Sequence, residues 1–154
     1  MSGFLWEQSV LPPLRVNVTA RTIIMGTAAS RDWQPQHHDA TWAVAHSGLP
    51  DIIMNNYTMA GWVSRYITDW SGPQGRIGRL SLQMKTPVCP GDELLFSGAM
   101  KSAEVMEPDI RWMAIAVELA VSNRVVATAA VRLAVPAVPG AASAWHCPPE
   151  RWQP

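Results

Sequence analysis

The sequence has few cysteines, no excess of charge of either sign and no long uninterrupted apolar run. Its two cysteines, Cys89 and Cys147, are too few for a disulfide scaffold and do not have a metal-binding spacing. Twelve basic residues balance twelve acidic ones, so no strong field attracts a nucleic acid or an anionic membrane. The most apolar stretch, 112–138, is interrupted by charged residues, and a membrane span needs about 20 apolar residues. We therefore expect neither a nucleic-acid partner nor a membrane partner.

The composition indicates one globular domain with a substantial core. The 154 residues are 48% hydrophobic and 16% charged, which is typical of folded domains rather than disordered segments. Eight tryptophans are many for this length, and because tryptophan is enriched at interfaces, we expect part of the surface to be covered in an oligomer. The first residues, MSGFLWEQSVLPPL, do not resemble a secretory signal, so we expect a cytoplasmic location.

Local signals divide the first third of the chain into short elements. Two adjacent prolines favour an irregular arm, the β-branched run TIIMGTAAS favours a strand, and Asp39 is a suitable N-cap for a helix. In order, we expect an irregular arm over 1–20, a strand over 22–30, a polar turn over 31–38, a short helix over 40–46, and a brief strand or extended entry over 51–54.

A helix with one broad apolar face is the clearest element of the sequence. Its apolar residues recur at steps of three and one: Met59, Trp62, Val63, Tyr66, Ile67 and Trp70. Asn55 or Asn56 is the expected N-cap and Gly72 the expected end. The helix should therefore have about 15 residues and a length of roughly 22 Å.

Beyond this helix the apolar period changes to two, which indicates strands. We expect strands over 79–88, 93–101, 111–121 and 124–135, followed by an irregular proline-rich tail over 136–154. Antiparallel strands that bury large side chains against one helix give an α+β fold of the hot-dog kind, in which a curved sheet wraps around a long central helix. No internal repeat or linker is visible, so 1–154 is expected to be a single domain.

The polar turn, SRDWQPQHHD, contains the residues best suited to acid–base chemistry. Asp32 and His37 flank Pro35, and a turn with this proline can aim both side chains at one place. A carboxylate and an imidazole that share a water can remove and return a proton near neutral pH. The spacing alone equally allows a solvated loop in which Asp32 caps a backbone group, because polar turn residues usually bond the backbone.

The same turn resembles a motif of the MaoC-like and R-specific enoyl-CoA hydratases, D-x-N-P-x-H-x-D-x-x-x-A. The matching residues are Asp32, Pro35, His37, Asp39 and Ala43. Gln34 stands where the motif has asparagine, and residues 87–92 are similar to a second family element, P-V-x-P-G-D. RDWQPQHHD and SRYITDWSGP also resemble the short MaoC-like subunit of steroid side-chain enoyl-CoA hydratases, which works with a longer MaoC-like partner.

The resemblance implies a 2-enoyl-CoA thioester as substrate, to which Asp32 and His37 would add an activated water, with no cofactor and no metal. Gln34, Asn55 and Asn56 would bind the substrate. Gln34 would orient the catalytic pair or the thioester, because an amide does not titrate. The N-terminus of the central helix offers N–H donors to a developing enolate oxygen, and the backbone N–H of Asn56 is the matching position. The family usually has His-Gly where Asn55 and Asn56 stand.

Other functions stay open on the sequence. The chain could be an enoyl-CoA hydratase, acting for example on a bulky steroid-type ester; a hot-dog acyl-CoA thioesterase; or a non-catalytic subunit that completes a partner's site. A homodimer or a heteromer with another MaoC-like chain is expected. A metal cluster of His37, His38, Asp39 and His46 is a weaker alternative. Basic residues of the strand region could meet CoA phosphates or be solvated: Arg76, Arg79, Lys85 and Lys101.

Overall fold

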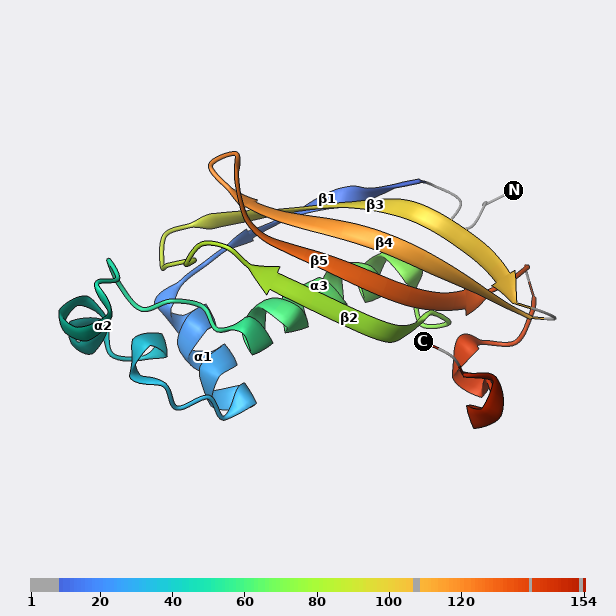
Figure 1. Cartoon of the computed structure of the whole chain (residues 1–154), viewed down its shortest axis with the longest axis horizontal. Coiled ribbons are helices and arrows are strands. Elements are labelled where there is room, and N and C mark those ends of the chain that lie inside the picture. The colour runs from blue at the N-terminus through green and yellow to red at the C-terminus, as the bar shows by residue number, and fades with distance from the viewer. Residues whose placement is uncertain (1–8, 107–108, 139, 153) are drawn as a thin grey trace.

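The computed structural model describes residues 9–106, 109–138, 140–152 and 154. Its helices and strands occur in the following order: β1 (Val10–Asn17), α1 (Ala20–Ser30), the 3-10 turn η2 (Pro35–His37), α2 (Ala40–Ser47), α3 (Asn56–Ser71), β2 (Arg76–Met84), β3 (Glu93–Met106), β4 (Ile110–Val121), β5 (Arg124–Pro136), η3 (Ala144–His146) and η4 (Pro149–Arg151). Figure 1 shows α3 running beneath a curved sheet, with α1 and α2 gathered at one end.

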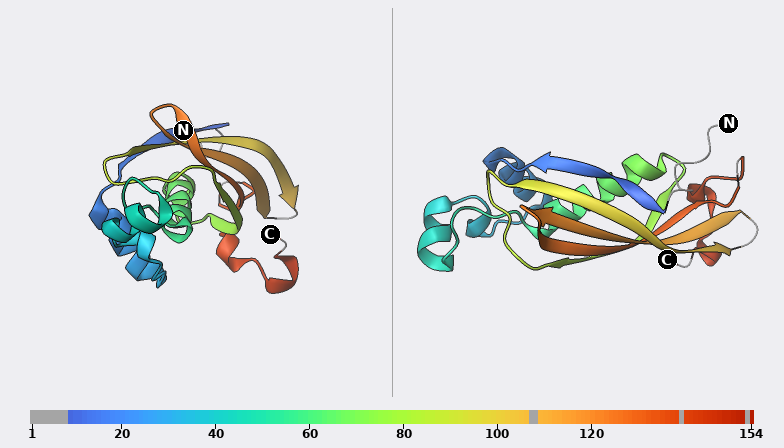
Figure 2. Two further views of the ribbon diagram at one scale, coloured as in Figure 1. Left: turned by 60° about the vertical axis from the view of Figure 1, so that its left-hand side comes forward. Right: turned by 90° about the horizontal axis from the view of Figure 1, so that it is seen from above.

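The sheet is antiparallel throughout the described chain, with strand order β1-β3-β4-β5-β2. Viewed from the end, the sheet curves around α3, so the helix lies on its concave side (Figure 2). This arrangement is the α+β fold with a central helix that the sequence predicts. Ser122 and Asn123 lie between the predicted strands over 111–121 and 124–135, and both have positive φ, as a tight hairpin turn requires.

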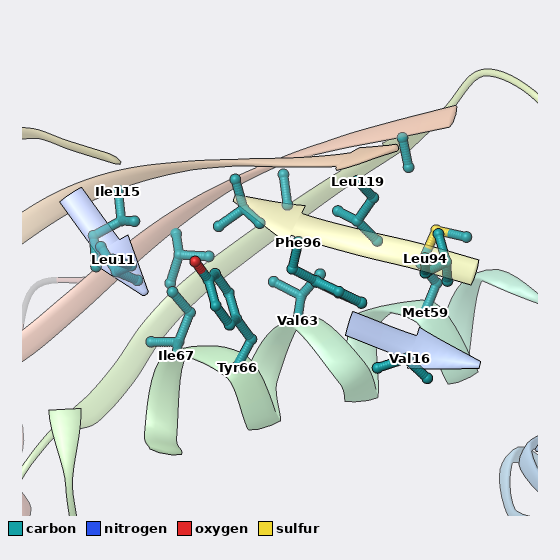
Figure 3. Close-up of a cluster of buried hydrophobic side chains, with 14 of the residues drawn as sticks. Leu11, Val16, Met59, Val63, Tyr66, Ile67, Leu94, Phe96, Ile115 and Leu119 are labelled. Atoms are coloured by element: carbon teal, nitrogen blue, oxygen red, sulfur yellow. The ribbon is translucent and has the colours of Figure 1, made fainter. Parts of the chain in front are cut away.

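The core lies between α3 and the inner face of the sheet (Figure 3). The predicted apolar stripe is confirmed: Met59, Val63, Tyr66, Ile67 and Trp70 are buried, and Trp62 is half-buried against the same core. From the sheet, alternate residues of β4 point inward and are buried: Met113, Ile115, Val117 and Leu119. Full burial of such a side chain stabilises a fold by about 1.5–3 kcal/mol, so this one interface fixes the position of α3.

Helix α1 corrects the prediction of a strand over 22–30. Its start is held by a capping box in which the Thr19 side chain accepts from the Thr22 N–H and the Thr22 side chain contacts the Thr19 N–H. Ile23 and Thr27, one helical turn apart, are its buried residues. The β-branched composition suggested a strand, but the cap and the helical spacing of the buried side chains decide the local structure.

Strand β1 corrects the prediction of an irregular arm over 1–20 for the part of that arm that is described. β1 pairs with β3 only and forms an edge of the sheet. The register shifts between Leu11 and Leu14, which places Pro12 and Pro13 where the ladder is interrupted. An edge strand with a bulge tolerates prolines, because the missing N–H groups are not needed there.

The remaining elements agree with the sequence to within a few residues. Asp39 caps the short helix α2 through the Trp42 N–H, as expected. Residues 51–54 are an extended entry without strand pairing. β2 ends at Met84 rather than at 88, because the N–H groups of Lys85 and Thr86 both bond Val126 O. None of the helices in the described part of the chain is long and apolar enough to cross a membrane.

The tail after β5 is irregular, as predicted, but its described residues pack against one end of the sheet. The ring of Trp152 packs at a tilt of 51° against Trp112 of β4, with 4.7 Å between ring centroids, and Trp145 Nε1 donates to Gly75 O at 3.0 Å. The guanidinium of Arg76 lies 3.8 Å from the centroid of Trp152 and 5.2 Å from that of Trp145. The tail thereby covers a second small apolar cluster on the outer side of the sheet.

Candidate active site

The end of α1 positions the carboxylate of Asp32. Arg31, the C-cap, adopts a left-handed conformation with φ 55°, which turns the chain sharply out of the helix. The Asp32 N–H then bonds Thr27 O at 3.1 Å. This turn holds the side chain of Asp32 beside the start of α3 rather than letting it extend into solvent.

The short turn η2 positions the imidazole of His37. Pro35 opens the turn, where its fixed φ is suitable, and the His37 N–H bonds Gln34 O. Nδ1 of His37 lies 2.7 Å from the backbone carbonyl of Ile53. Because a carbonyl only accepts, Nδ1 carries the proton, and in the neutral ring Nε2 is left with a free lone pair.

That free nitrogen faces Asp32. Nε2 of His37 lies 3.4 Å from Oδ2 of Asp32, and the two side chains are only 8% and 16% exposed. The bend therefore brings together the two groups that the sequence singles out. A separation of 3.4 Å exceeds a good direct hydrogen bond and allows both atoms to contact one water.

Asn55 connects this pair to the central helix. Its Oδ1 accepts from the Thr58 N–H at 2.9 Å and so caps α3, as expected for one of the two candidate asparagines. Its Nδ2 donates to Asp32 Oδ2 and to Ser30 Oγ, each at 2.9 Å. Asn55 is 2% exposed, and both ends of its amide are occupied by protein groups. This geometry fits a residue that positions Asp32 better than one that contacts substrate.

The other two expected substrate-binding residues are exposed. Gln34 lies at the start of η2, and its side chain does not cap that turn. Asn56 is the first residue of α3, next to Asn55. Its backbone N–H belongs to the first helical turn, where no acceptor exists within the helix, and it lies at the positive end of the helix dipole. The start of α3 thus offers N–H donors beside the Asp32–His37 pair.

Two further groups of the site are not predicted from the sequence. Ser30 Oγ accepts from Asn55 and donates to Gly26 O at 2.8 Å, so it joins α1 to the start of α3. The carbonyl of Ile53 fixes the ring of His37. A backbone carbonyl leaves no residue-type signal, and a serine at a helix end has many alternative roles.

The remaining histidines and acids of this region lie apart from the pair. His38 is exposed, and His46 is exposed on α2, where its ring stacks on Trp42 with centroids 5.1 Å apart. Asp39 is engaged as the cap of α2. In the described part of the chain, no three His, Cys, Asp or Glu side chains converge as a metal site would require.

Comparisons with known proteins agree on one family. The family model described as "MaoC like domain" matches residues 4–123. The 3-oxo-4,17-pregnadiene-20-carboxyl-CoA hydratase beta subunit of Mycobacterium tuberculosis is 40% identical over 90 residues, which are 58% of this chain and 69% of that protein.

Solved structures give the same result. The structure of the ChsH1-ChsH2 complex from Mycobacterium tuberculosis has a chain with a TM-score of 0.72 and 32% identity, over 82% of this chain and 94% of that one. The MaoC-like dehydratase from Rhodospirillum rubrum has a TM-score of 0.74 over 90% of this chain and 99% of that one, and at 22% identity it supports the fold alone. With the family model covering most of the described fold, this chain belongs to the MaoC-like dehydratase family.

Proposed function

We propose that this chain is a catalytic subunit of an enoyl-CoA hydratase, which adds water across the double bond of a 2-enoyl-CoA thioester. Asp32 and His37 are its catalytic pair. The observation that carries this proposal is the 3.4 Å separation between His37 Nε2 and Asp32 Oδ2, with Nδ1 of the same ring committed to Ile53 O. Membership of the MaoC-like family supports the same chemistry.

The reaction follows from these two acceptors. One water donates a hydrogen bond to each of Nε2 and Oδ2, which leaves an oxygen lone pair to attack C3 of the enoyl group. The new C–O bond forms as one of the two acceptors takes a proton from that water. The double-bond electrons shift toward the thioester as an enolate, and the pair returns a proton to C2, so that water is added overall.

The enolate oxygen needs hydrogen-bond donors in a site shielded from water. The start of α3, which Asn55 ties to Asp32, offers N–H groups that have no acceptor within the helix, and the N–H of Asn56 is among them. Asn56 has a side chain where glycine is usual in the family, so the thioester approaches this end of α3 from the side that the asparagine leaves open. Gln34, exposed beside the pair, orients the thioester.

A partner chain completes the substrate site. Large apolar side chains next to Asp32, on α1 and at the start of α3 are strongly exposed, with Trp33 at 68%, Met25 at 57% and Tyr57 at 62%. Exposed apolar side chains of this size around a polar site indicate an interface. Relatives named as a hydratase beta subunit and as a two-protein complex support a heteromer with another MaoC-like chain, although a homodimer would bury the same residues.

The acyl group is bulky in this proposal. The 40% identical relative is named for a steroid CoA ester. Near the start of α3, the neighbouring residues Ala60 and Gly61 have minimal side chains. Gly61 is exposed and no atom lies within 4 Å of a Cβ added there, so this side of α3 leaves room for a large ring system.

The test is to mix the purified chain, alone and together with a longer MaoC-like chain from the same source, with straight-chain and steroid-type 2-enoyl-CoA esters. Hydration removes the enoyl absorbance and releases no free thiol. Loss of absorbance without thiol supports the proposal. Release of CoA thiol would instead identify a thioesterase, and activity of the complex that survives replacement of Asp32 would identify a non-catalytic subunit.

A further inference from the structure

The outer face of the sheet carries basic residues that the proposed reaction does not use. Arg79 of β2 and Arg132 of β5 are directly opposite each other in the antiparallel register. Both point away from α3, because their neighbours Leu80, Val131 and Leu133 alternate toward the core. Lys101 of β3 sits at the register shift between Met100 and Ser102 and lines the same hollow.

These three cations surround a shallow hollow of about 240 Å³, which we call the basic hollow. Small side chains of β4 and β5 form its floor: Ala114, Ala116 and Ala130. An alanine floor leaves the sheet backbone close to the surface, so another chain can approach closely. Figure 1 shows no helix over this part of the convex face, whereas the tail packs near one end of the sheet.

The charges of the basic hollow are not neutralised within the described chain. No ion pair of the described residues involves Arg79, Lys101 or Arg132. The Nε of Arg132 is buried without a hydrogen-bond partner, and its guanidinium lies 4.9 Å from the ring centroid of Trp112. Like charges directly opposite each other in a sheet are destabilising, so this arrangement costs stability unless an anion is bound.

The substrate of the Asp32–His37 pair is not that anion. The pair lies at the start of α3, on the concave side of the sheet, while the basic hollow opens on the convex side. Side chains of the core fill the space between them. Arg76, another cation of β2, is engaged instead by Trp145 and Trp152 of the tail.

The overall span of the cations, from Lys101 to Arg79, suits an extended acidic segment. Across the sheet they follow the order β3, β5, β2, with β4 between the first two, so Lys101 and Arg79 are three strand steps apart. At about 4.8 Å per step this is roughly 14 Å. In an extended chain, side chains at alternate positions share a face and repeat every 6.6–6.8 Å or so, which places three carboxylates along roughly the same span.

From this match we infer that the basic hollow is a docking surface for an extended acidic segment of a protein partner. A second copy of this chain fits less well. The outer face of a second copy carries Glu104 and Glu118 outside the hollow, so these carboxylates are fewer than the three cations of the basic hollow. The inference is independent of the hydratase proposal, because it uses the other face of the sheet.

The experiment is an NMR titration of the ¹⁵N-labelled chain with a short capped peptide of alternating glutamate and alanine. A peptide with glutamine in place of glutamate is the control probe. We expect shifts confined to the amides of Ala114, Ala116 and Ala130 and to the Nε–H of Arg132. The glutamine peptide should leave these signals in place.

Variants decide whether the hollow itself binds. The double variant Arg79→Gln with Lys101→Gln should bind the acidic peptide about tenfold more weakly or worse. The control variant Arg124→Gln, at an exposed residue of the β4–β5 turn, should bind it as the wild type does. Enoyl hydration should be unchanged in both. Shifts that are absent, that persist in the double variant, or that acetate reproduces at equal carboxylate concentration would overturn the docking inference without affecting the hydratase proposal.

Discussion

Nδ2 of Asn55 lies 2.9 Å from Oδ2 of Asp32, so the residue that caps the central helix also holds the carboxylate beside His37. The Asp32–His37 pair and the start of α3 are therefore one structural unit. A change at Asn55 should alter both helix stability and catalysis, and different substitutions should separate the two effects.

Asn55→Ser and Asn55→Ala provide that separation. Serine can still accept from the Thr58 N–H, whereas alanine cannot. The free energy of unfolding should therefore be about 1 kcal/mol lower for the alanine variant than for the serine variant. Alanine has no donor, and the shorter serine side chain does not span from the Thr58 N–H to Asp32 as the amide does, so kcat should fall to a similar extent in both. Chemical denaturation and hydration kinetics measure the two effects. Recovery of full activity by serine would show that Asn55 acts only through the cap.

The close approach of α1 and α3 predicts opposite effects for two glycine substitutions. A Cβ added at Gly26 would lie 2.0 Å from Oγ1 of Thr58, so Gly26→Ala must push the helices apart and should destabilise the fold by about 1–3 kcal/mol. At Gly61 of α3 no atom lies within 4 Å of the added Cβ. Gly61→Ala should stabilise by about 0.5–1 kcal/mol through helix propensity. Urea midpoints of the two variants measure this, and equal shifts in one direction would contradict the packing described.

Tyr66 predicts a change of stability at alkaline pH. Burial raises the pKa of its hydroxyl above 10.0, and contact with the Gly98 backbone offsets only part of this. Because an unfolded tyrosine ionises near pH 10 and the folded one does so later, stability should fall as the pH rises above about 10. Tyr66→Phe should remove that contribution.

The Tm of Tyr66→Phe should therefore be close to that of wild type at neutral pH. Above pH 10 it should exceed the wild-type Tm by an increasing margin. The hydroxyl is buried without a hydrogen-bond partner of good geometry, so phenylalanine should cost little at pH 7. A loss above about 1 kcal/mol at neutral pH would instead indicate a hydrogen bond from Tyr66 that stabilises the fold.

The parts of the fold that the sequence predicts well are those with long periodic signals. The stripe from Met59 to Trp70 identifies α3, and alternation identifies the strands that cover it. The sequence predicts a strand over 22–30 because the β-branched composition favours one, while the evidence for helix α1 is a threonine pair at its cap. The sequence does not predict the strand at 10–17, because two prolines are compatible with a strand only at a sheet edge, and edge position is a property of the whole sheet.

The candidate site also combines features that a local sequence pattern predicts with features that depend on tertiary packing. The Asp32–His37 pair follows from a local turn, and the structure brings the two side chains together. The sequence places Asn55 among the substrate-binding residues, but its amide is occupied by Ser30, Asp32 and Thr58. Ser30 and Asp32 come from α1 and from the loop after it, and packing of α1 against α3 is a tertiary relationship that no local pattern contains.

The most direct test of the account is the rate of enoyl-CoA hydration in the active assembly with Asp32→Asn, His37→Ala and, as a control, His38→Ala. His38 is adjacent but exposed, so its replacement should leave the rate near that of wild type. Each substitution in the pair should lower kcat by about 10²- to 10⁴-fold, the usual contribution of a positioned acid or base. Near wild-type hydration by either of these two variants, in a folded assembly, would contradict the assignment of Asp32 and His37 as the catalytic pair.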